Sequence, residues 1–228
     1  MMSTQKSDRY FFTGLGIWAF LLTFIGFSPT FYLRPAAKDA LPLYIVLHGV
    51  LASLWVLFFL LQAGLISAQQ RKLHATLGLL SIPLCLAVAA TGAVVALRSL
   101  EHQGNPIWHV CLSLNNVLYL LLFVVLGIRS KNRPDYHKRF MVLALVPFLG
   151  PSAARWNYAG FVPAWGPPML TFAPMIAMFV YDYLSRKSIH RVTLIGFPCV
   201  IAWGVMTVFL ARIPAFENLV RHLARMVS

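Results

Sequence analysis

Residues 41–69 read LPLYIVLHGVLASLWVLFFLLQAGLISAQ and contain no Asp, Glu, Lys or Arg. A helix needs about 20 apolar residues to cross a bilayer, so this stretch is long enough to span one. Stretches of the same character recur along the chain and together predict seven spans: 11–33, 41–69, 74–97, 106–128, 138–156, 167–184 and 192–211. The sequence therefore predicts an all-α, polytopic integral membrane helical bundle whose core is formed by spans 2 to 5.

Composition supports this class of protein. Hydrophobic residues make up 59% of the chain and charged residues 11%, which is typical of a polytopic membrane protein and not of a soluble domain. The loops between the predicted spans are short, so residues 1–212 are expected to form a single transmembrane domain. Residues 213–228 are expected to form an amphipathic helix at the membrane surface, because five apolar residues share one helical face: Phe216, Leu219, Val220, Leu223 and Val227.

The net charge of +13 does not indicate nucleic-acid binding, because the basic residues lie in short loops between apolar spans. With seven spans, twelve of them fall on one side: Lys6, Arg9, Arg71, Lys72, Arg129, Lys131, Arg133, Lys138, Arg139, Arg186, Lys187 and Arg191. Basic loops stay in the cytoplasm. We therefore expect a multi-pass protein of the inner (cytoplasmic) membrane, with the N-terminus in the cytoplasm and the C-terminus outside.

The six acidic residues all fall in loops, in tails or at span ends. A proton- or sodium-coupled carrier usually keeps an acidic side chain near the middle of the bilayer, so this distribution argues against ion-coupled transport. The three cysteines lie within predicted spans and indicate no disulfide framework.

The histidines carry the functional hypothesis. Three of the seven fall in loops, at a span border or in the tail, where we expect solvated side chains: His102, His190 and His222. The others lie one per span in four consecutive spans: His48, His74, His109 and His137. The topology predicts an outer pair from spans 2 and 4 and an inner pair from spans 3 and 5. Two imidazoles from facing helices are the axial ligands of a b-type haem, so all four are candidate ligands of haem iron, with copper as an alternative metal.

Other polar residues fit this hypothesis. Arg155 ends span 5 near the outer surface, where its guanidinium could bind a haem propionate or an anionic substrate. Four basic residues flank the inner pair: Arg71, Lys72, Lys138 and Arg139. Gln62, Asn115 and Asn116 are candidates for hydrogen bonds between helices.

A purely structural interpretation stays open. His74 and His137 stand beside cations at span borders, where histidine is ordinary, and the segments HATLG and HKRFM could simply begin helices. Trp, Tyr and Arg residues near span ends are also common anchors at the membrane interface.

Three segments carry a resemblance to a known group: LHGVLASLWVLFFLLQ, RKLHATLG and HKRFM. The chain resembles a group of uncharacterised bacterial polytopic membrane proteins that share a histidine, tryptophan and glutamine along one span, then HxxLG, then HKRxM. That group implies no established activity. The arrangement of histidines is also similar to that of transmembrane di-haem b-type cytochromes of the ascorbate-reducible kind. These pair the second helix with the fourth and the third with the fifth.

The resulting hypothesis is a haem-b-binding electron-transfer protein of the membrane, linked to quinone or another redox partner, and so a candidate membrane oxidoreductase. One alternative is an accessory subunit or assembly factor of a larger membrane complex, without a cofactor. A third is a carrier for a small or lipid-like molecule, with Arg155 and the asparagines in its site.

Overall fold

The long uncharged stretches form long helices. The structure is a computed structural model that describes residues 2–35, 38–102 and 104–227, without the side chains of residues 2–7 and 9, so the predicted loop charges of Lys6 and Arg9 lie outside the described part. The helices found there are α1 (Met2–Phe27), α2 (Leu43–Ser67), α3 (Arg71–Gly78), α4 (Ser81–His102), α5 (Ile107–Arg129), α6 (Pro134–Tyr158), α7 (Gly166–Arg186), α8 (Arg191–Leu210) and α9 (Pro214–Val227). A π-helical turn, η1 (Ser28–Tyr32), extends α1, and these described ranges contain no strand.

Among the described residues, five helices are long and apolar enough to cross a membrane: α2, α4, α5, α8 and the stretch Tyr10–Tyr32 of α1 and η1. The predicted all-helical bundle is confirmed. Helices α6 and α7 match the fifth and sixth predicted spans in position, but they are less apolar because charged residues and internal prolines interrupt them. The count of seven membrane crossings stays a prediction.

The third predicted span differs from the structure at its start. Residues 74–97 were expected to form one span, but the chain breaks after Gly78 and a new helix begins at Ser81. The Ser81 hydroxyl donates a hydrogen bond to the Gly78 carbonyl (2.6 Å) at this break. His74 therefore lies on the short, separate helix α3, which packs against α2.

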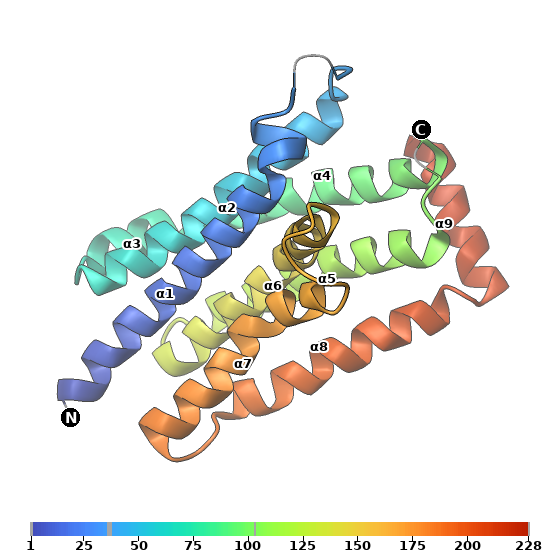
Figure 1. Cartoon of the computed structure of the whole chain (residues 1–228). Helices are drawn as coiled ribbons and strands as arrows, with labels where there is room; N and C mark the ends of the chain where they lie inside the picture. Colours follow the sequence, from blue (N-terminus) through green and yellow to red (C-terminus); the bar gives the residue numbers. More distant parts are fainter. Residues whose placement is uncertain (1, 36–37, 103, 228) are drawn as a thin grey trace.

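Five helices close a ring (Figure 1): α1 packs on α2, α2 on α4, α4 on α5, α5 on α6, and α6 on α1. Helix α6 also contacts α2, α7 and α8, and it supplies an unbroken run of buried apolar residues from Val142 to Val146. Helix α1 contributes Leu15, Ala19 and Leu22 to the same core. The core therefore includes α1 in addition to the four helices that correspond to predicted spans 2 to 5.

Helix α9 lies across the ends of α4 and α5 (Figure 1), where Val220 and Ala224 are buried. Arg98 of α4 donates a hydrogen bond to the Val227 carbonyl (2.6 Å) and holds the last turn of α9. Leu219 and Leu223 of the predicted apolar face remain 52% and 39% exposed. The contact of this face with a membrane surface stays a prediction.

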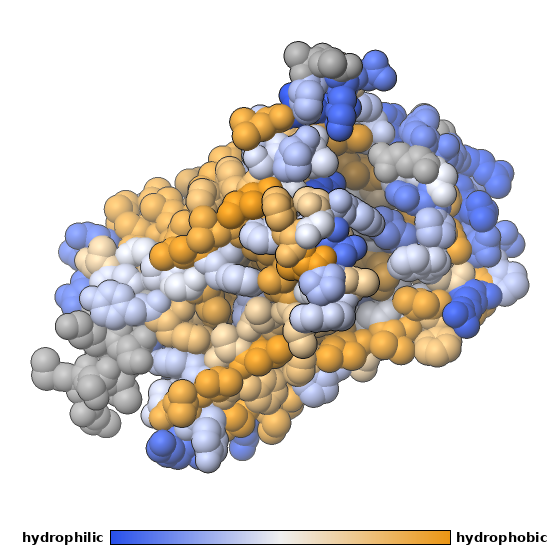
Figure 2. All heavy atoms as spheres, viewed as in Figure 1, coloured by the Kyte–Doolittle hydropathy of each residue, from blue (hydrophilic) through white to orange (hydrophobic). Residues whose placement is uncertain are grey.

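The surface agrees with a membrane protein. Figure 2 shows hydrophobic side chains along the length of the helices and hydrophilic residues concentrated toward the two ends. Large exposed apolar side chains follow α8, including Leu194, Ile201 and Phe209. Contiguous exposed apolar surface is unusual for a soluble monomer and is expected where lipid or a partner covers it.

Candidate functional site

The structure brings His74 and His137 together. Their ring centroids lie 6.0 Å apart and the ring planes are nearly perpendicular, at 87°. Two metal–nitrogen bonds of about 2 Å each, with about 1.1 Å from each nitrogen to its ring centre, place imidazole centroids about 6 Å apart across one ion. The centroid separation of the predicted inner pair thus matches that of two imidazoles on opposite sides of one metal ion.

Backbone carbonyls orient both rings. Nδ1 of His74 lies 3.3 Å from the carbonyl oxygen of Gln62, and Nδ1 of His137 lies 2.8 Å from that of Gly127. A neutral imidazole that donates from Nδ1 keeps a lone pair on Nε2, which is the usual arrangement of a metal-binding histidine. Within the described residues, neither Nε2 has a hydrogen-bond partner. Burial lowers the pKa of His74, with an opposing effect of the Gln62 carbonyl, and this favours the neutral ring.

Unpaired polar atoms lie near this pair. Within the described part of the chain, neither amide atom of Gln62 has a hydrogen-bond partner although both are buried, and the amide oxygen faces α3 at Gly78. The indole nitrogen of Trp55, two turns earlier on α2, is also buried without a partner. Buried polar atoms are nearly always paired, so an additional group that contacts Gln62 would explain the arrangement.

The predicted outer pair is arranged differently. Nδ1 of His48 lies 3.1 Å from the Thr91 hydroxyl, and the ring fits against Gly92, where an added Cβ would lie 3.1 Å from His48 Cε1. The same Cβ position is 3.4 Å from Val117 of α5, which is eight residues, or about 12 Å along the helix, beyond His109. His109 is exposed and its ring contacts Trp108. The described contacts therefore do not join His48 to His109.

Arg155 lies at the junction of α6 with the end of α1. Its Nε donates to the Thr30 hydroxyl (3.2 Å), one terminal nitrogen donates to the Pro151 carbonyl (2.9 Å), and the guanidinium lies 3.8 Å from the ring centre of Phe27. These contacts tie α6 to α1 and η1. They place Arg155 at the opposite end of α6 from His137.

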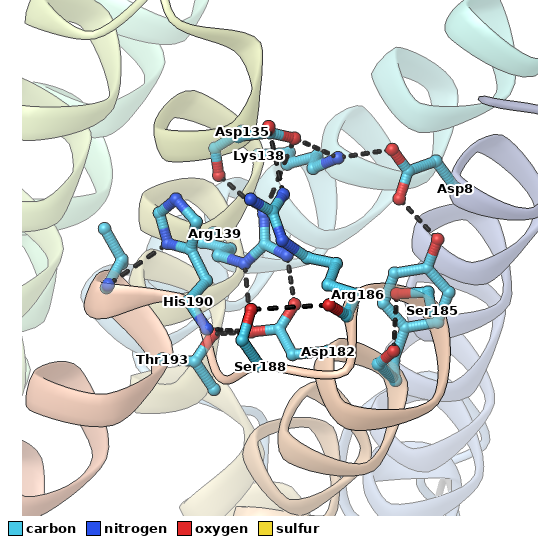
Figure 3. A network of polar contacts seen from close by, with 12 residues as sticks. Asp8, Asp135, Lys138, Arg139, Asp182, Ser185, Arg186, Ser188, His190 and Thr193 are labelled. Atoms are coloured by element: carbon cyan, nitrogen blue, oxygen red, sulfur yellow. Dashed lines mark hydrogen bonds and ion pairs between the residues drawn. The ribbon is translucent and has the colours of Figure 1, made fainter. Parts of the chain in front are cut away.

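A polar network joins α1, α6, α7 and α8 at the end of the bundle where His137 lies (Figure 3). Arg139 and Asp182 form a salt bridge in which both side chains are only 1% exposed. Asp182 also accepts hydrogen bonds from the Thr193 hydroxyl (2.6 Å) and the His190 amide (3.0 Å). Arg139 is one of the four basic residues predicted to flank the inner pair, and its charge is bound by Asp182.

The neighbouring charges form a second part of the network. Lys138 lies 2.7 Å from Asp8 and 2.8 Å from Asp135, and Arg186 lies 3.1 Å from Asp135. Burial alone would raise the pKa of Asp135, but the hydrogen bonds and charges of Lys138 and Arg186 outweigh it and lower the pKa to about 2. Of the four basic residues predicted to flank the inner pair, the two on α6 are thus neutralised, whereas Arg71 and Lys72 on α3 are exposed.

Sequence reasoning missed two features of this network. His190 was expected to be solvated, but it is 8% exposed, and its Nδ1 accepts a hydrogen bond from the Val192 amide at the start of α8. Burial and the charges of Arg139 and Arg186 lower its pKa. Asp182 was assigned to a span end without a partner. The sequence signal for this pair was the position of Asp182 within an apolar segment, because a buried acidic side chain requires a basic partner.

Comparisons with protein-family models, with curated proteins and with solved structures found no match to this chain.

Proposed function

We propose that this chain is a membrane electron-transfer protein that binds one haem b, with His74 and His137 as the axial ligands. The observation that carries the proposal is the 6.0 Å separation of these rings, together with carbonyls that bind Nδ1 of each and leave Nε2 for a metal. Haem supplies one-electron redox chemistry when bound. The chain is proposed to cross the inner membrane seven times, with the N-terminus in the cytoplasm, and to exchange electrons with quinone or another redox partner.

The surrounding residues fit such a group. The carbonyls of Gln62 and Gly127 fix the tautomer and orientation of the two rings, as outer-shell partners of metal ligands do. The unpaired amide of Gln62 supplies a donor and an acceptor beside α3. Arg71 and Lys72 provide exposed positive charge on the same short helix. The contacts of His48 and His109 give no comparable support for a second haem.

The test is an absorption spectrum of the protein purified in detergent. We expect a reduced-minus-oxidised spectrum typical of a six-coordinate b-type haem, with one haem per chain by pyridine haemochrome assay. His74→Ala and His137→Ala should each abolish the six-coordinate spectrum, whereas His109→Ala and His222→Ala should retain it. Circular dichroism and gel filtration of all four variants control for folding.

Two other results would overturn the haem assignment. Stoichiometric copper by elemental analysis, lost in His74→Ala, would indicate a copper centre; the Met141 thioether one turn after His137 is a ligand type that copper accepts. A colourless, metal-free protein that co-purifies with other membrane subunits would indicate an accessory subunit or assembly factor.

A further inference from the structure

A cavity of about 220 Å³ lies among α5, α6, α7 and α8, on a different part of the bundle from the histidine pair. Its lining is mainly apolar and includes Asn115 of α5. Asn115 precedes Gly127, the partner of His137, by twelve residues, which is about 18 Å along the helix. Several lining residues are only half-buried, including Asn116, Thr171 and Gly204, so the cavity opens to the surface.

Asn115 gives this cavity a specific polar group. Asn115 is 5% exposed, and its amide oxygen is buried without a hydrogen-bond partner among the residues that the structure describes. Two other polar groups of the lining are satisfied: Tyr119 donates to the carbonyls of Cys199 and Val200 (3.0 and 3.1 Å), and Thr171 donates to that of Pro167 (2.8 Å). A residue of the cavity lining therefore carries a buried acceptor that lacks a donor among the described residues, which is an unusual state for a native protein.

The size and shape of the lining indicate what could supply that donor. Apolar cavities of about 150 Å³ admit benzene, so 220 Å³ has room for one ring with small substituents. Tyr119 and Phe172 offer aromatic surface. Gly150 and Gly204, on α6 and α8, have no atom within 4 Å of the position of a Cβ, so the two helices leave open space here.

We infer that this cavity binds a small aromatic molecule with a hydroxyl group, of the phenol or hydroquinone class, whose O–H donates to the amide oxygen of Asn115. The apolar lining and the rings of Tyr119 and Phe172 contact the ring of the ligand. This binding site is independent of the proposed haem, because it uses none of the histidines and can be measured without a metal.

The test compares 4-methylphenol with p-xylene, which replaces the hydroxyl by a methyl group of similar size. Both are titrated into the full-length protein in detergent by isothermal calorimetry, with empty micelles as the blank. We expect the wild-type protein to bind 4-methylphenol about five- to tenfold more tightly than p-xylene, the effect of one hydrogen bond to a buried acceptor. Asn115→Leu should abolish this preference and retain the binding of p-xylene.

Filling the cavity is the second arm. Gly204→Leu should abolish the binding of both molecules, whereas Gly64→Leu, a matched control on α2 that also has open space around it, should bind both as the wild type does. Asn115→Ala repeats the first arm if Asn115→Leu does not fold. Equal wild-type affinities for the two molecules, a preference that survives in Asn115→Leu, or unchanged binding in Gly204→Leu would each overturn the inference.

Discussion

At the scale of single residues, the pair Arg139 and Asp182 illustrates what an ion pair does inside an apolar bundle. The transfer of either charge out of water costs several kcal/mol, and their mutual attraction offsets this only while both are present. Thr193 and the His190 amide complete the hydrogen bonds of the carboxylate. The pair therefore holds α6, α7 and α8 in contact. It contributes to stability mainly because neither buried charge is left without a partner.

Removal of one partner should be costly. We expect Asp182→Leu to lower the free energy of unfolding by about 3–5 kcal/mol, because it removes the buried counter-charge of the Arg139 guanidinium and leaves only the half-exposed Asp135 carboxylate, 3.8 Å away. The double variant Arg139→Met/Asp182→Leu should recover most of this loss. Reversible unfolding in mixed detergent micelles measures both values.

An exposed ion pair serves as the control. Arg221 and Glu217 on α9 lie 2.7 Å apart but are 45% and 33% exposed, so Arg221→Ala should change the free energy of unfolding by less than about 1 kcal/mol. Our interpretation of the buried pair is wrong if Asp182→Leu is as mild as Arg221→Ala.

At the scale of elements, the contact of α1 with α6 depends on a glycine. A Cβ added to Gly26 would lie 2.7 Å from the Ser152 carbonyl oxygen and 3.1 Å from the Trp156 ring. The Trp156 indole in turn donates to the Leu22 carbonyl (3.0 Å), which holds the two helices at this distance. The close approach requires the absence of a side chain at residue 26, and backbone at Ser152 cannot move aside as a flexible side chain would.

Two substitutions in the same helix should act in opposite directions. Gly26→Ala should lower the free energy of unfolding by about 1–3 kcal/mol, as overpacking does. Gly14→Ala should raise it by about 0.5–1 kcal/mol, because residue 14 has no atom within 4 Å of its Cβ position and alanine favours a helix. The detergent unfolding assay compares both with the wild type, and equal effects of the two substitutions would contradict the proposed contact.

At the scale of the whole molecule, the open question about topology concerns α6 and α7. These two helices follow one another and pack together. Seven crossings require both of them to span the membrane, and five crossings require that neither does. Five and seven are both odd, so either number of crossings places the two termini on opposite sides of the membrane. In the structure, α1 begins and α9 ends at opposite ends of the bundle (Figure 1). The location of the termini therefore does not separate the two topologies, but the α6–α7 connection does.

Labelling of that connection separates five crossings from seven. Gly160 has a positive φ of 76° and lies in the exposed turn after α6, so Gly160→Cys introduces an accessible thiol with modest backbone strain. In a Cys199→Ser background, we expect a membrane-impermeant maleimide added to intact spheroplasts to label residue 160. Seven crossings place this turn outside.

The control is Ser130→Cys in the same background. Residue 130 lies in the α5–α6 turn, and the positive-inside rule places this turn in the cytoplasm. It should be labelled only after the membrane is opened. Labelling of both residues in the same compartment would show that α6 does not cross the membrane.

The sequence determined the helical class and most helix positions, because long uncharged stretches can hide their backbone polar groups from lipid only as helices. It also identified four candidate histidines, because histidine is uncommon in apolar spans and costly to leave unpaired there. Topology arguments went one step further and predicted the pairing of His74 with His137.

Which of these residues meet depends on how the helices pack in three dimensions. The rotation and axial offset of the helices place the ring centroids of His74 and His137 6.0 Å apart but leave His109 exposed. The spacing of residues along the sequence specifies neither the rotation nor the offset. The burial of Asp182 against Arg139 and the unpaired oxygen of Asn115 are likewise results of packing between distant segments. Local sequence determines whether each segment forms a helix, whereas the site depends on contacts among helices that are far apart in the chain.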